Sequence, residues 1–249
     1  MDWSYPSLLL GGAAALLVGF AKTGMPGAGI PAVALMAEAF RGNTELSVGA
    51  ILPILILGDL FAIAYYRRHA DWKRLLELAP YVAVGMVPGY LVLLLFRHLE
   101  GDGLRILIGV IILLLLGLQM ARHRFGWEKM AEHPWFGAMM GIMAGFGTTV
   151  GNAAGPVMGI YLISKDMDKH QFMGTGAWFF FLVNVSKIPF FCALGMITQE
   201  TLKFDLLLIP IVALAAILGA MVLKKIPQTV FNILVLGLAG VAALRMVLF

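Results

Sequence analysis

A short glycine-rich stretch with a single lysine interrupts the first apolar segment of the chain. It covers residues 19–31 and reads Gly-Phe-Ala-Lys-Thr-Gly-Met-Pro-Gly-Ala-Gly-Ile-Pro. Glycines free the backbone there, so that unpaired N–H groups at the start of the next helix can face a ligand, and such helix ends carry partial positive charge. With the ammonium of Lys22 nearby, this combination favours the binding of an anion.

A second copy of the stretch follows 126 residues later (145 minus 19). Residues 145–157 read Gly-Phe-Gly-Thr-Thr-Val-Gly-Asn-Ala-Ala-Gly-Pro-Val, with the same start and a glycine at the offset of Gly29. Thr148 stands where the first copy has Lys22, so the two copies do not supply a symmetric pair of lysines. A helix break that occurs once in each half of an apolar chain points to the central site of a transporter.

Three further polar residues lie deep inside apolar segments, namely Asp59, Asn184 and Lys187. Asn184 and Lys187 are three residues apart and share one helix face. A charge at such a depth costs roughly 2.5–3.5 kcal/mol, so a partner or a wet cavity is expected. In one interpretation Asp59 forms a structural ion pair with Lys187 or with Lys22. In the other, Lys187 contacts the anion and Asp59 carries a proton whose binding follows substrate occupancy.

We predict one substrate site in which both helix breaks meet these polar residues. A competing account is that the glycines serve close helix packing and the threonines bond to backbone carbonyls. Lys22 favours the site, because packing alone does not require a charge inside the break. The candidate substrate-binding residues are Lys22, Thr23, Gly24, Gly27, Gly29, Thr148, Thr149, Gly151, Asn152, Asn184 and Lys187, and Asp59 is the candidate for proton coupling.

Composition determines the environment in which such a site must work. Hydrophobic residues make up 61% of the chain and charged residues only 13%, and the mean hydropathy is +0.91. That is too little polar surface for a water-soluble globule of 249 residues, so we predict an integral membrane protein. The formal net charge of +4 does not indicate nucleic-acid binding, because the basic residues lie in short loops between apolar segments.

No cofactor, bound metal or enzymatic activity is expected. Cys192 is the only cysteine, which excludes an intramolecular disulfide and a thiolate metal cluster. The five histidines lie in loops or at helix ends, and none has a metal-ligand spacing with an acidic residue. The sequence contains no nucleophile elbow and no phosphate-binding loop. The aromatic run Trp178–Phe181 is interpreted as lipid-facing or as core packing.

The apolar segments form two similar halves of one polytopic domain, residues 1–249. We predict an all-α integral membrane protein with two inverted repeats, about 7–121 and about 135–248, each a broken, re-entrant helix pair plus three transmembrane helices. The landmarks Pro80 and Gly89 recur in order as Pro210 and Gly219, which supports a duplication. The expected helices are 7–22, 28–40, 44–66, 75–96, 104–120, 135–149, 153–164, 170–196, 206–223 and 230–248.

The distribution of basic residues favours the inverted arrangement. If each broken pair leaves the membrane on the side where it entered, eleven Lys and Arg residues fall on one side and five on the other. If each broken pair is a single crossing, the same loops divide about eight to seven and no orientation is preferred. We therefore expect the basic loop Arg67–Arg74 in the cytoplasm and both termini on the opposite side.

The pattern at Gly19–Pro31, its degenerate copy at Gly145–Val157 and the two similar halves of a helical chain resemble the sulfite exporter TauE/SafE family of membrane permeases. The resemblance covers essentially the whole chain. It implies secondary transport of small sulfur-containing or organic anions, such as sulfite, sulfoacetate or organosulfonates. It also implies a location in the cytoplasmic membrane of a prokaryote.

We thus predict a secondary transporter that exports its substrate. It works by alternating access around a site at the middle of the membrane, where the two helix breaks lie. Its expected partners are a small anion, the lipid bilayer and, if transport is coupled, protons; a homo-oligomer is left open. Two alternatives come from other classes: a membrane scaffold or assembly factor that transports nothing, and a passive anion channel.

Overall fold

The computed structural model describes residues 4–24, 29–41, 43–97, 103–121, 133–165 and 167–222, together with residues 241, 244, 247 and 248. The secondary structure of this part of the chain is helical, without strands. Within it, five helices are long and apolar enough to cross a membrane. The protein is therefore an all-α, multi-pass membrane protein, and the fold class predicted from composition is confirmed.

The first half contains the first helix break and three long helices. It consists of α1 (Tyr5–Thr23), α2 (Gly29–Ala39), α3 (Thr44–Tyr66), the 3-10 turn η1 (Arg67–His69), α4 (Trp72–Arg97) and α5 (Gly103–Ala121). The second half repeats this order with α7 (Pro134–Gly151), α8 (Gly155–Ser164), α9 (Lys169–Ala193) and α10 (Gln199–Val222). The helix predicted at 230–248 lies outside the described residues except for four isolated positions.

The turn between α9 and α10 lies earlier in the chain than expected, since α9 ends at Ala193 and α10 begins at Gln199. Gly195 has a φ of 67° and ends α9 with a Schellman motif, in which Met196 N–H donates to the Phe191 carbonyl at 2.9 Å. Thr198 and Thr201 then cap α10 reciprocally: each backbone N–H donates to the other's hydroxyl, at 2.9 and 3.2 Å. These local hydrogen bonds outweigh the apolar pattern that placed the start at residue 206.

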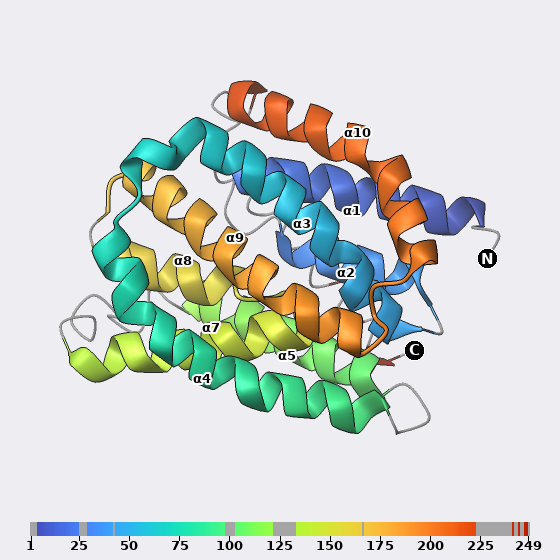
Figure 1. Ribbon diagram of the computed structural model, residues 1–249, viewed down its shortest axis with the longest axis horizontal. Coiled ribbons are helices and arrows are strands. Elements are labelled where there is room, and N and C mark those ends of the chain that lie inside the picture. The colour runs from blue at the N-terminus through green and yellow to red at the C-terminus, as the bar shows by residue number, and fades with distance from the viewer. Residues whose placement is uncertain are drawn as a thin grey trace.

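The long helices pack in pairs that cross between the halves. Figure 1 shows α1 beside α10, α4 beside α7, and α3 and α9 between these two pairs. Both outer pairs depend on small residues for close approach. A Cβ at Gly219 would lie 2.6 Å from Thr23 Oγ1, and a Cβ at Gly89 would lie 2.8 Å from Thr149 Cβ. The two halves thus contact each other through equivalent interfaces.

The same contacts give the relative directions of the helices. Gly11 faces Phe204 and Gly19 faces Val212, so α1 and α10 run parallel. The pair α4 and α7 is also parallel, by the corresponding contacts of Gly141 with Leu78 and of Gly145 with Val82. In contrast, α3 and α9 run antiparallel, because Asp59 meets Asn184 while Gly49 near the start of α3 faces Met196 beyond the end of α9.

Candidate substrate-binding site

A cavity of about 80 Å³ lies where the two helix breaks meet. Gly29 begins α2 and Gly155 begins α8, and both line this cavity. A Cβ added to either glycine would meet no atom of the described chain within 4 Å, so both helix starts open into free space. One buried water needs roughly 10–15 Å³ of such volume, so the cavity has room for several waters or for a small anion.

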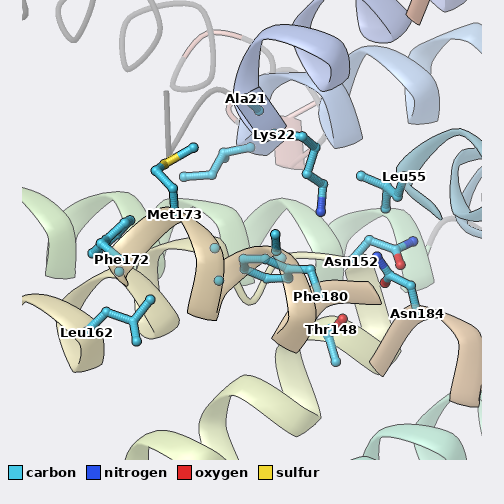
Figure 2. Close-up of a pocket in the computed structure, with 17 residues that line it drawn as sticks. Ala21, Lys22, Leu55, Thr148, Asn152, Leu162, Phe172, Met173, Phe180 and Asn184 are labelled. Carbon is cyan, nitrogen blue, oxygen red and sulfur yellow. The ribbon is translucent and has the colours of Figure 1, made fainter. Parts of the chain in front are cut away.

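Lys22, in the last turn of α1, brings the positive charge to this cavity (Figure 2). Its ammonium lies 2.7 Å from Oδ1 of Asp59 and 4.3 Å from the centroid of the Phe180 ring. Asn184 Nδ2 donates a hydrogen bond of 2.8 Å to the other carboxylate oxygen of Asp59. The Asp59 side chain is fully buried, whereas 11% of the Lys22 side chain is exposed. A ligand in the cavity therefore meets the cation first, with its counter-charge behind it.

Lys187 binds the second helix break from the side of α9. Its ammonium donates to the carbonyl and the hydroxyl of Thr148, both at 3.0 Å, and to Oδ1 of Asn152 at 2.5 Å. A cation is stabilised at this point, because the carbonyls at the end of α7 carry partial negative charge. The Asn152 amide also donates to the Val48 carbonyl of α3 at 3.0 Å, which ties the break to the first half.

The Asn152 backbone has left-handed dihedral angles, with a φ of 52°. Its N–H donates to the Thr148 carbonyl and that of Ala153 donates to the Gly147 carbonyl, both at 3.0 Å, which ends α7 and turns the chain into α8. Asparagine tolerates this conformation better than most residues. The residue that closes the break is thus the same one that Lys187 binds.

The structure brings about half of the predicted site residues to the cavity. The lining includes Lys22, Gly29, Thr148, Asn152 and Asn184. Lys187, Gly24 and Gly151 do not line it, and Gly27 lies outside the described residues.

The two remaining threonines, Thr23 and Thr149, are buried and bond to backbone. Thr23 Oγ1 donates to the carbonyls of Gly19 and Ala216, at 3.1 and 2.9 Å, and Thr149 Oγ1 to that of Gly145 at 2.8 Å. For these two side chains the packing interpretation describes the structure. Of the two partners considered for Asp59, the described chain pairs it with Lys22 and not with Lys187.

Sequence reasoning missed the apolar part of the cavity. Phe180 belongs to the aromatic run that was interpreted as lipid-facing or core packing, yet it lines the cavity between Asn184 and Gly176. The helical spacing of four residues from Asn184 to Phe180 and from Phe180 to Gly176 is the signal that would have placed them on one face. Further lining residues without a polar signal are Leu55, Gly159, Leu162, Phe172 and Met173.

The fold and this cavity define a multi-pass helical membrane protein of the transporter class. The family model for the sulfite exporter TauE/SafE matches residues 9–246, and the chain therefore belongs to the TauE/SafE family, a family of membrane transporters. A search of curated proteins and a search of solved structures each gave no significant match. A small anion as substrate suits both the family and the charge that Lys22 brings to the cavity.

Proposed function

We propose that this protein is a secondary transporter that exports small sulfur-containing or organic anions, such as sulfite, sulfoacetate or organosulfonates, across the cytoplasmic membrane of a prokaryote. One observation carries the proposal: the starts of α2 and α8 and the ammonium of Lys22 open into the same cavity. Helix N-termini with free N–H groups and a partly desolvated cation are the groups that hold an anion in a low-dielectric site.

Alternating access by two inverted repeats is the mechanism that the helix directions support. The pairs α1 with α10 and α4 with α7 are parallel, and the pair α3 and α9 is antiparallel. Because the chain also reverses its direction from α3 to α4 and from α9 to α10 (Figure 1), α1 and α7 run in opposite directions. Asp59 and Asn184 occupy equivalent positions, 125 residues apart (184 minus 59), and bond to each other. An axis that relates two inverted halves would pass between these two side chains. Rocking of one half against the other would then open the site to one side of the membrane and close it to the other.

Proton coupling follows from competition for Lys22. An anion that approaches the Lys22 ammonium draws it away from Asp59, whose buried carboxylate then lacks its counter-charge. Binding of a proton by Asp59 removes that cost, because a neutral carboxyl needs no ionic partner. We therefore propose that one proton moves with the anion and that Asp59 carries it.

Counterflow in proteoliposomes tests the proposal. Vesicles loaded with unlabelled sulfite should accumulate external labelled sulfite if the protein is a carrier, whereas a channel gives no accumulation and a scaffold moves no anion. Lys22→Met should weaken anion binding by about 2 kcal/mol or more, which is about 30-fold. Lys203→Met, an exposed position near the start of α10, is the matched control and should bind as the wild type does. Equal affinity in both variants would refute the role of Lys22.

Topology has its own experiment. In a Cys192→Ala background, a cysteine at Ala70 in the basic loop should be protected from an impermeant thiol reagent added outside intact cells. A cysteine in the turn 97–103 and a tag after Phe249 should both be accessible. Labelling of the basic loop from outside would overturn the inverted arrangement with external termini.

A further inference from the structure

The cavity has two chemically different ends, which Figure 2 shows side by side. Lys22, Thr148, Asn152 and Asn184 gather at one end. The start of α8 at Gly155 follows Asn152 by three residues and belongs to this end. At the other end lie Phe172, Met173 and Leu162, and Phe180 stands between the two groups. Among the described residues, the polar side chains that line the cavity are thus confined to one end of it.

Two facing helix surfaces run from the polar end of the cavity to its apolar end. Gly155, Gly159 and Leu162 follow one face of α8, and Asn184, Phe180, Gly176 and Phe172 follow one face of α9. The ring of Phe172 comes from a position eight residues before Phe180, which is about 12 Å along the helix axis. This end therefore extends away from Lys22 for more than the length of a small inorganic anion.

Two glycines keep the apolar end open. A Cβ at Gly159 would meet no atom of the described chain within 4 Å, and a Cβ at Gly176 would lie 3.7 Å from Leu162 Cδ1, an ordinary contact. Helix packing therefore does not require glycine at either position. Because a glycine has no side chain, each of these two positions leaves space in the cavity that a ligand can occupy.

We propose that the preferred substrate is a monoanion with a short apolar tail, such as a small alkanesulfonate, rather than inorganic sulfite. This inference rests on the proposed function. The charged head lies at Lys22 and the start of α8, and the tail lies beside Phe180 and extends toward Phe172. A mostly apolar pocket with a few placed polar groups binds its ligand in this way, because the apolar surface supplies affinity and the polar groups supply orientation.

The first experiment compares the affinities of anions that each carry three oxygens on sulfur. Sulfite and the series from methanesulfonate to butanesulfonate are titrated calorimetrically against the full chain in detergent, with empty micelles as the control for partition. Each methylene that enters the apolar end should tighten binding about fourfold, which corresponds to about 0.8 kcal/mol. The gain should level off when the cavity is full.

The second experiment fills the apolar end. Gly159→Ala and Gly176→Ala, singly and together, should weaken butanesulfonate by about fourfold or more and change sulfite by less than about twofold. Gly137→Ala is the matched control: its added methyl would lie 3.7 Å from Tyr161 Cε2, outside the cavity lining. Gly155→Ala, at the polar end, should weaken every anion alike.

The outcomes separate the two proposals. Flat affinity along the series, or equal losses for sulfite and butanesulfonate in the Gly159 and Gly176 variants, would overturn the apolar tail and leave anion transport standing. If the wild-type protein binds none of these anions and shows no counterflow with them, both proposals are refuted. Affinity that rises along the series and is lost selectively in the two glycine variants supports the tailed substrate.

Discussion

Removal of the Lys22 charge should destabilise the protein more than removal of both charges of its ion pair. The ammonium and carboxylate lie 2.7 Å apart, and at an effective dielectric constant near 20 their attraction is about 6 kcal/mol. Part of this attraction offsets the free-energy cost of removing both charged groups from water. Loss of one partner from a buried pair costs about 3–5 kcal/mol, because the other charge stays buried without compensation. We expect a loss in this range for Lys22→Met.

The other variants of the cycle should lose less. In Lys22→Met/Asp59→Asn neither charge of the ion pair is left, and the new amide oxygen can accept the hydrogen bond from Asn184, so stability should return to within about 1 kcal/mol of the wild type. Asp59→Asn alone should be intermediate, since Lys22 keeps its contact with the Phe180 ring and some exposure to the cavity.

Denaturant titration of the purified variants in detergent gives the free energies of unfolding that this cycle requires. Anion affinity is measured on the same samples. The double variant should be stable and yet bind anions about 30-fold more weakly, because the cation of the site is gone. Equal losses of stability in Lys22→Met and in the double variant would refute the compensation of Asp59 by Lys22. Wild-type affinity in the double variant would refute the anion contact.

Three further predictions concern the pH dependence of transport, the buried Lys187 and the carboxyl group of Asp168. Asp59→Asn in liposomes should transport without the pH dependence of the wild type; unchanged pH dependence would exclude Asp59 as the proton carrier. Lys187→Met should lower the free energy of unfolding by about 3 kcal/mol or more, because its acceptors at the end of α7 lose their donor; weaker binding with unchanged stability would instead make Lys187 an anion contact. The N–H groups of Gln171 and His170 hold the pKa of the Asp168 carboxyl below its usual value. Its contribution to stability is therefore present above the unfolded value of about 3.9 and is lost as the pH falls through the lower folded pKa, so thermal unfolding should separate Asp168→Asn from the wild type at pH 6 but not in strong acid.

Helix ends show how far local sequence signals reach. The span Thr44–Tyr66 is found as predicted, because a long apolar run between polar residues leaves little choice of boundaries. The α9–α10 turn was misplaced, because hydropathy alone does not register the left-handed Gly195 or the reciprocal caps of Thr198 and Thr201. Both signals were local and readable from turn and cap chemistry.

The second helix break shows which features cannot be predicted from local sequence signals. Thr148 stands at the position equivalent to Lys22, and this absence of a second lysine was visible in the sequence. Only the folded chain shows that Lys187, 39 residues further on, reaches Thr148 and Asn152. Only the folded chain likewise shows that Phe180 faces the cavity and that Lys22 pairs with Asp59.

The sequence by itself determined the membrane environment and the two helix breaks. Both follow from the number and spacing of apolar and helix-breaking residues, which act over one helix length or less. Tertiary structure alone decided which buried charges meet and how the cavity is divided into a polar and an apolar end. Those properties depend on the rotation and depth of α1, α3, α8 and α9 relative to one another, which packing between distant segments sets.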